Sequence, residues 1–69
     1  MKYRVYFDTE ELLECDNFRT IYKAALTWIK NDLCKNAIFV KVDEYYNKVV
    51  IGTMNKYTIN FYNHKTIDF

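Results

Sequence analysis

Residues 17–36, NFRTIYKAALTWIKNDLCKN, decide the fold because they carry a long helical pattern of apolar side chains. These side chains recur three, four and seven residues apart, a spacing that gathers them on one side of an α-helix. Asn17 is suited to accept hydrogen bonds from the first free backbone N–H groups, and Asn36 tolerates the left-handed conformation that often ends a helix. We therefore predict an amphipathic helix with this apolar stripe: Phe18, Ile21, Tyr22, Ala25, Trp28, Ile29 and Leu33.

Two strands are predicted before the helix. Residues 2–8 alternate strictly, with Tyr3, Val5 and Phe7 on one side of the chain. A period of two residues is that of a half-buried strand. Residues 12–15 return as a second strand, although the turn before them lacks the Asn-Gly or Asp-Gly pair typical of tight hairpins.

Three further strands are predicted after the helix, at residues 37–45, 49–54 and 57–64, with turns at 46–48 and 55–56. In each strand, one alternating set of apolar residues is assigned to the side that meets the helix. The strand residues predicted to form the core are Tyr3, Val5, Phe7, Leu13, Ile38, Val40, Val42, Val49, Ile51, Ile59 and Phe61.

The predicted element order is ββαβββ, within 69 residues. We expect residues 1–69 to form one small domain, since so short a chain cannot divide its hydrophobic core. One amphipathic helix can cover only one face of a sheet. The prediction is a two-layer α+β fold, with the helix packed on one face of a mainly antiparallel sheet.

The second face of this sheet is the predicted binding surface. Seven Tyr, five Phe and one Trp make the chain 19% aromatic, more than a core of this size can hide. Exposed tyrosines supply large and stiff contact area, which binding surfaces use. The residues expected on the open face, or at its ends, are Arg4, Tyr6, Phe39, Lys41, Tyr45, Asn60, Tyr62 and His64.

Three interpretations of this surface remain open. Its aromatic residues can anchor a protein interface, including one between two copies of the chain in a homodimer. They can also stack on unpaired bases, with Arg4 and Lys41 near phosphates, as in open-sheet nucleic-acid binders. The third interpretation is cross-strand pairing that only stabilises a small sheet. We favour the protein interface, because the net charge is only +1 and no RNP-like motif is present.

The residue inventory gives little support to catalysis, metal binding or cofactor binding. His64 is the only histidine. Gly52 is the only glycine, too few for a phosphate-cradling loop, and we expect it to relieve crowding or a bulge in its strand. The acids within residues 8–16 lack the register of a calcium loop. Cys15 and Cys34 are expected roughly 20 Å apart at opposite helix ends, so we predict free thiols. From the residue inventory as a whole we expect no metal, no cofactor and no enzymatic activity.

The cellular setting is predicted from composition. No apolar stretch approaches the roughly 18 residues that span a bilayer, and free thiols match a reducing compartment, so we expect a cytoplasmic protein without membrane contact. Lysine outnumbers arginine eight to two, a bias typical of AT-rich genes such as those of many phages. We predict a small protein-binding module, with inhibition of a host enzyme or defence system by a phage-encoded protein as one such role.

Overall fold

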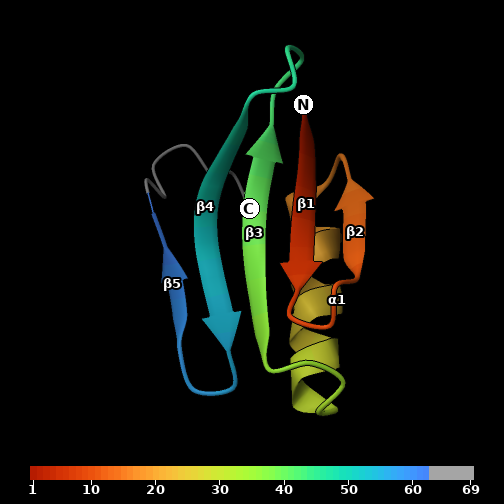
Figure 1. The fold of residues 1–69 in the computed structure, drawn as a ribbon, viewed down its shortest axis with the longest axis vertical. Coiled ribbons are helices and arrows are strands. Elements are labelled where there is room, and N and C mark those ends of the chain that lie inside the picture. Colours follow the sequence, from red (N-terminus) through yellow and green to blue (C-terminus); the bar gives the residue numbers. More distant parts are fainter. Residues whose placement is uncertain (63–69) are drawn as a thin grey trace.

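The computed structural model describes residues 1–62 and has one helix packed on one face of a five-stranded antiparallel sheet (Figure 1). Along the sheet the strands are in the order β2-β1-β3-β4-β5, and each neighbouring pair is antiparallel. The predicted α+β fold with element order ββαβββ is confirmed. The elements are β1 (Lys2–Phe7), β2 (Leu12–Cys15), α1 (Phe18–Lys30), β3 (Asn36–Val42), β4 (Lys48–Asn55) and β5 (Ile59–Phe61).

The helix begins where the sequence predicts and ends earlier. The Asn17 side chain accepts a hydrogen bond from the Arg19 backbone N–H at 2.9 Å. The helix ends at Lys30, and Asp32 takes the left-handed conformation with φ of 58°. Asn36, predicted for that role, instead begins β3. Because the helix stops at this point, Leu33 lies outside its stripe and is 57% exposed.

Helix α1 and the sheet enclose a core rich in aromatic rings. The Phe18 ring packs against Tyr3, Phe39 and Phe61, with ring centroids 5.4 to 5.8 Å apart. Phe7 stacks on Trp28 at 4.5 Å. Much of the surplus aromatic content therefore stabilises the helix–sheet contact. The buried cluster consists of Val5, Phe7, Phe18, Ile21, Ala25, Ile29, Cys34, Ala37, Phe39, Ile51 and Met54.

The central strand β3 is turned over relative to the sequence prediction. Its register with β1 pairs Phe39 with Val5, a core residue, and pairs Ile38 with Tyr6 on the opposite face. Phe39 is fully buried beneath the helix, whereas Val40 and Val42 are buried outside the helix–sheet cluster. The prediction that Ile38, Val40 and Val42 meet the helix is therefore wrong.

A β-bulge lies where β4 passes Phe39. Phe39 pairs with Gly52 and Val40 with Val50, which leaves Ile51 as the extra residue of β4. The expected role of Gly52 at a bulge or crowded position is confirmed, since it lies next to the bulge and against the Phe61 ring.

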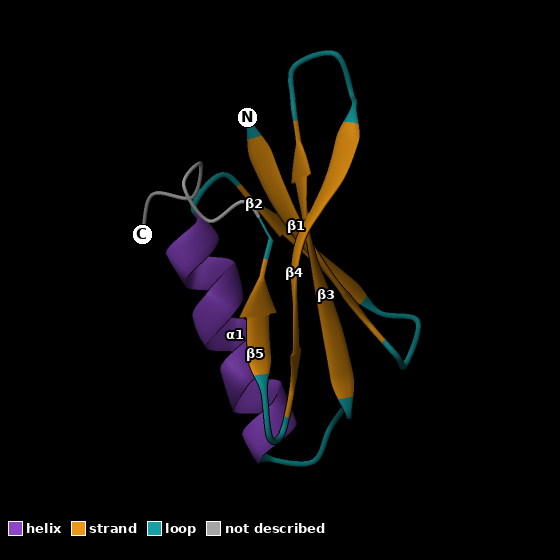
Figure 2. Ribbon diagram, turned by 90° about the vertical axis from the view of Figure 1, so that its left-hand side faces the viewer, coloured by secondary structure: helices purple, strands orange, loops and turns teal. Residues whose placement is uncertain are grey.

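The helix covers only part of its face of the sheet. In Figure 1 it lies behind β1 and β2, and Figure 2 shows it along one side of the sheet. Val49 and Ile59 lie on the helix side of β4 and β5 and remain 51% and 42% exposed. Their predicted burial in the core is wrong because α1 does not cover them, and a hollow of about 340 Å³ lies where Ile59 faces Leu26 and Lys30 of the helix.

Candidate binding surface

The outer face is the sheet surface opposite to α1, toward which Figure 1 looks. All five strands belong to this sheet, so no other helix or strand of residues 1–62 covers it (Figure 2). Strand alternation and the pairing registers give its members. They are Lys2, Arg4, Tyr6, Leu12, Glu14, Ile38, Val40, Val42, Lys48, Val50, Thr53 and Asn60.

Apolar side chains run across four strands of the outer face. Leu12, Tyr6 and Ile38 pair in one row across β2, β1 and β3. In the next row Val40 pairs with Val50 across β3 and β4. Leu12, Ile38 and Val50 are 48%, 42% and 47% exposed. Val40, at the centre of these rows, is only 5% exposed, so Leu12, Ile38 and Val50 are the most exposed members of this apolar patch, on a face that an antiparallel sheet would normally make polar.

The charged groups within this patch are already paired. Arg4 Nε donates to Glu14 Oε2 at 2.6 Å, and Arg4 Nη1 donates to the Tyr6 hydroxyl at 3.2 Å. Lys2 Nζ lies 3.3 Å from the other oxygen of Glu14. The hydrogen bond from Arg4, followed by that from Lys2, holds the pKa of Glu14 below its ordinary value. This arrangement keeps the positive charge of Arg4 compensated inside an apolar surface.

Two of the residues predicted for the outer face lie on the helix side of the sheet instead. Arg4, Tyr6 and Asn60 are on it as predicted. Phe39 is instead a core residue, and Lys41 lies on the helix side opposite Tyr3. Both corrections have the same cause, because the phase of β3 is inverted along its whole length.

The exposed tyrosines are spread over the ends of the sheet. β3 ends at Val42, three residues earlier than predicted, so Tyr45 lies in the β3–β4 loop, 78% exposed beside Tyr46. Tyr57 is 89% exposed in the β4–β5 turn, at the other end of β4. Tyr62 follows β5 and is 48% exposed. His64 lies outside the described residues.

The outer face therefore carries five aliphatic residues among its twelve, with Tyr6 as its aromatic residue among residues 1–62. Base stacking on this face was predicted to use Tyr6 with Phe39, Tyr45 and Tyr62, and the structure does not gather these rings. Leu12 and Val50 were not predicted as surface residues, and Ile38, Val40 and Val42 were predicted on the wrong face. One feature of the sequence could have indicated that β3 has an apolar outer face: both of its alternating sets of side chains are apolar.

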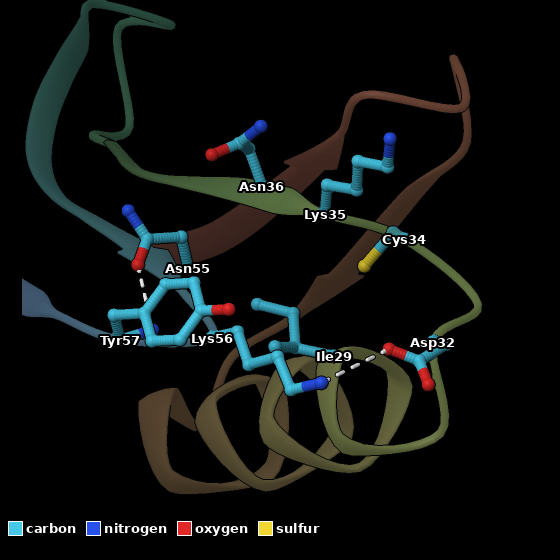
Figure 3. Close-up of a pocket in the computed structure, with 8 residues that line it drawn as sticks. All are labelled: Ile29, Asp32, Cys34, Lys35, Asn36, Asn55, Lys56 and Tyr57. Atoms are coloured by element: carbon cyan, nitrogen blue, oxygen red, sulfur yellow. Dashed lines mark hydrogen bonds and ion pairs between the residues drawn. The ribbon is translucent and has the colours of Figure 1, made fainter.

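A separate hollow of about 360 Å³ lies at the far end of the helix, shown in Figure 3. It is lined by the end of α1, the loop after it and the β4–β5 turn, with Ile29, Cys34 and Tyr57 among its side chains. Lys56 Nζ lies 3.8 Å from Asp32 Oδ1 across it. Burial raises the pKa of the Cys34 thiol, which keeps it neutral.

Searches of family models, curated proteins and solved structures find no match to this chain. Within residues 1–62, no three His, Cys, Asp or Glu side chains gather as a metal site would require. The only helix of that region, α1, is too short and too polar to cross a membrane. Both cysteines, Cys15 and Cys34, are free thiols.

Proposed function

We propose that this protein is a non-enzymatic protein-binding module whose binding surface is the outer face of the sheet. The observation that carries the proposal is the contiguous apolar patch, with Leu12, Ile38 and Val50 each close to half exposed. Covering apolar surface is favourable by about 25 cal/mol per Å². The patch is bordered by Lys2, Lys48 and Asn60, and an apolar centre with a polar rim is the composition of protein interfaces.

The proposed mechanism is occlusion or recruitment by contact. A sheet face with an apolar patch can cover a site on another protein or hold that protein in place, and neither action needs chemistry in this chain. Inhibition of a host enzyme or defence system by a phage-encoded protein is one form of such occlusion, supported by the small size and the lysine-rich composition. The free thiols of Cys15 and Cys34 support a reducing, cytoplasmic setting.

A photo-cross-linking amino acid at Ile38 tests the proposed surface in the cell of origin. Ile59 provides a matched control, because both isoleucines are 42% exposed but lie on opposite faces of the sheet. We expect the probe at position 38 to give discrete protein adducts that the probe at position 59 does not give. Equal adducts from both positions, or none from position 38, would contradict the proposal.

A further inference from the structure

We propose that the occupant of the outer face is a second copy of this chain, packed face to face with β3 against β3 about a twofold axis parallel to the strands. This inference rests on the proposed function, since it names the partner of the same surface. The two copies would form four layers, helix–sheet–sheet–helix, with the sheets about 10 Å apart.

The composition of β3 supports a contact between two central strands. β3 is the middle strand of five, and its outer-face residues Ile38, Val40 and Val42 are all β-branched and aliphatic. Side chains of this kind interdigitate where two sheets pack face to face, and Ile38, 42% exposed, is the one that reaches the surface, since Val40 and Val42 are already only 5% and 4% exposed in the single chain. The strand is therefore apolar on both faces, as expected for a strand enclosed by layers on both sides.

The size of the face fits a stable dimer. The molecule measures 33 × 22 Å in the plane viewed in Figure 1, which bounds the outer face at roughly 700 Å². Each partner in a standard interface contributes about 800 Å². A chain of about 60 residues also buries a smaller share of its surface than larger domains, and self-association is one way to compensate.

The charge distribution favours an axis parallel to the strands. Such an axis keeps each row of the outer face opposite the same row of the partner, so that Ile38 faces Ile38. An axis across the strands would instead place Arg4 opposite Arg4 near the centre. With the parallel axis Arg4 faces Val50 of the partner subunit while it remains paired with Glu14. Lys2 then faces Lys48 of the partner subunit, but at the end of the face, where both long side chains reach solvent.

The first test is the solution mass of matched variants over a range of concentrations. The outer pair, Ile38→Thr with Val50→Thr, removes apolar contacts from the outer face and keeps the β-branching that strands prefer. The control pair, Ile59→Thr with Val49→Thr, makes the same chemical changes at similar exposures on the helix side. Circular dichroism establishes that each variant is folded.

We expect the native chain to show twice its monomer mass of 8.4 kDa, and the outer pair to raise the dissociation constant by about a hundredfold or more. The control pair should dimerise like the native chain. A native mass of 8.4 kDa at all concentrations overturns the inference. So does an outer pair that dimerises normally, or a control pair that is weakened equally.

Thiol cross-linking provides a second readout that does not depend on loss of binding. In a Cys15→Ser background, a short bismaleimide should join two copies of Ile38→Cys, because facing positions in sheets about 10 Å apart are too distant for a direct disulfide but within reach of the linker. Ile59→Cys, equally exposed on the other face, should stay monomeric with the same reagent. Equal cross-linking at the two positions, or no cross-linking of Ile38→Cys, overturns the proposed packing.

Failure of this inference and failure of the proposed function have different signatures. A monomeric chain whose photoprobe at Ile38 joins a different protein overturns the homodimer and leaves the outer face as a binding surface. A monomeric chain that gives no adduct from position 38 rejects both proposals.

Discussion

Gly52 lies directly against the Phe61 ring, so that a Cβ at Gly52 would stand 2.6 Å from Phe61 Cδ1 and 2.7 Å from the carbonyl oxygen of Asn60. Contacts this short force the neighbours to move. We predict that Gly52→Ala lowers the free energy of unfolding by about 1 to 3 kcal/mol, the usual cost of overpacking. Urea unfolding measures the loss. Thr53→Ala, at the next position on the outer face, should cost less than about 1 kcal/mol.

A second substitution separates the two obstacles at Gly52. Phe61→Leu removes the ring atoms and leaves the Asn60 carbonyl in place, so Gly52→Ala should be less costly in the Phe61→Leu background. A double-mutant cycle gives this coupling free energy. An alanine at position 52 that is neutral in the native background would contradict the crowding seen here.

The inverted phase of β3 predicts opposite sensitivities at two adjacent residues. Phe39 is fully buried against Val5 and the helix, whereas Ile38 is 42% exposed on the outer face. Phe39→Ala should lower the free energy of unfolding by about 3 to 5 kcal/mol, and Ile38→Ala by much less.

Phe39→Ala removes a large share of the total stability of a small domain, so two more conservative substitutions at the same positions provide the control. Phe39→Leu should still be clearly destabilising, whereas Ile38→Val should fall within about 0.5 kcal/mol of the native chain when measured at a concentration where it is monomeric. The reverse order would mean that Ile38 faces the helix, as the sequence alone had indicated.

The sequence predicts the elements of this fold well because each has its own local signal. The apolar stripe of α1, the cap at Asn17, and the alternation and turns of the strand segments were sufficient for the order ββαβββ and for the two-layer arrangement. These signals act within a few residues. They do not depend on which strands become neighbours.

The phase of β3 could not be predicted in the same way. Ala37 and Phe39 form one apolar set, and Ile38, Val40 and Val42 form another, so alternation alone does not say which set meets the helix. The choice is made by pairing with β1, which places Phe39 beside Val5. The candidate surface depended on that choice, and its predicted aromatic character was lost with it.

The β3–β4 loop provides a pH-dependent contribution to stability. Asp43 Oδ1 accepts hydrogen bonds from the backbone N–H groups of Tyr45 and Asn47 at 2.8 and 2.9 Å, and Oδ2 accepts from the Asn47 side chain at 3.1 Å. The bond from the Asn47 backbone contributes most to lowering the pKa of Asp43 below its ordinary value. A depressed pKa in the folded state means that the ionised carboxylate is stabilising.

This stabilisation should be fully present above the unfolded pKa of about 3.9 and should be lost as the pH falls through the lower folded value. Asp43→Asn keeps an oxygen acceptor for the two backbone donors but removes the titration, so its stability deficit at pH 7 should shrink in acid. Urea unfolding at several pH values measures this difference. Glu44→Gln removes the same formal charge one residue away, and a deficit of equal pH dependence there would assign the effect to net charge.

The apolar character of the outer face predicts a complex that salt hardly weakens. Its central contacts are aliphatic, and Arg4 is already paired with Glu14 within the same chain. Between 50 and 200 mM NaCl, the dissociation constant of the outer-face complex should therefore change by less than about threefold, because only the exposed charges of Lys2 and Lys48 are screened. A surface that binds nucleic acid through 6 to 10 phosphates would instead lose about a thousandfold or more in affinity over the same range.

Two measurements distinguish a protein complex from a nucleic-acid complex. The mass of the native chain is followed over a range of concentrations, and the binding of single-stranded DNA is followed in parallel by fluorescence anisotropy. Steep loss of DNA affinity with salt, together with a monomeric chain, would move the function of this face from protein contact to nucleic acid.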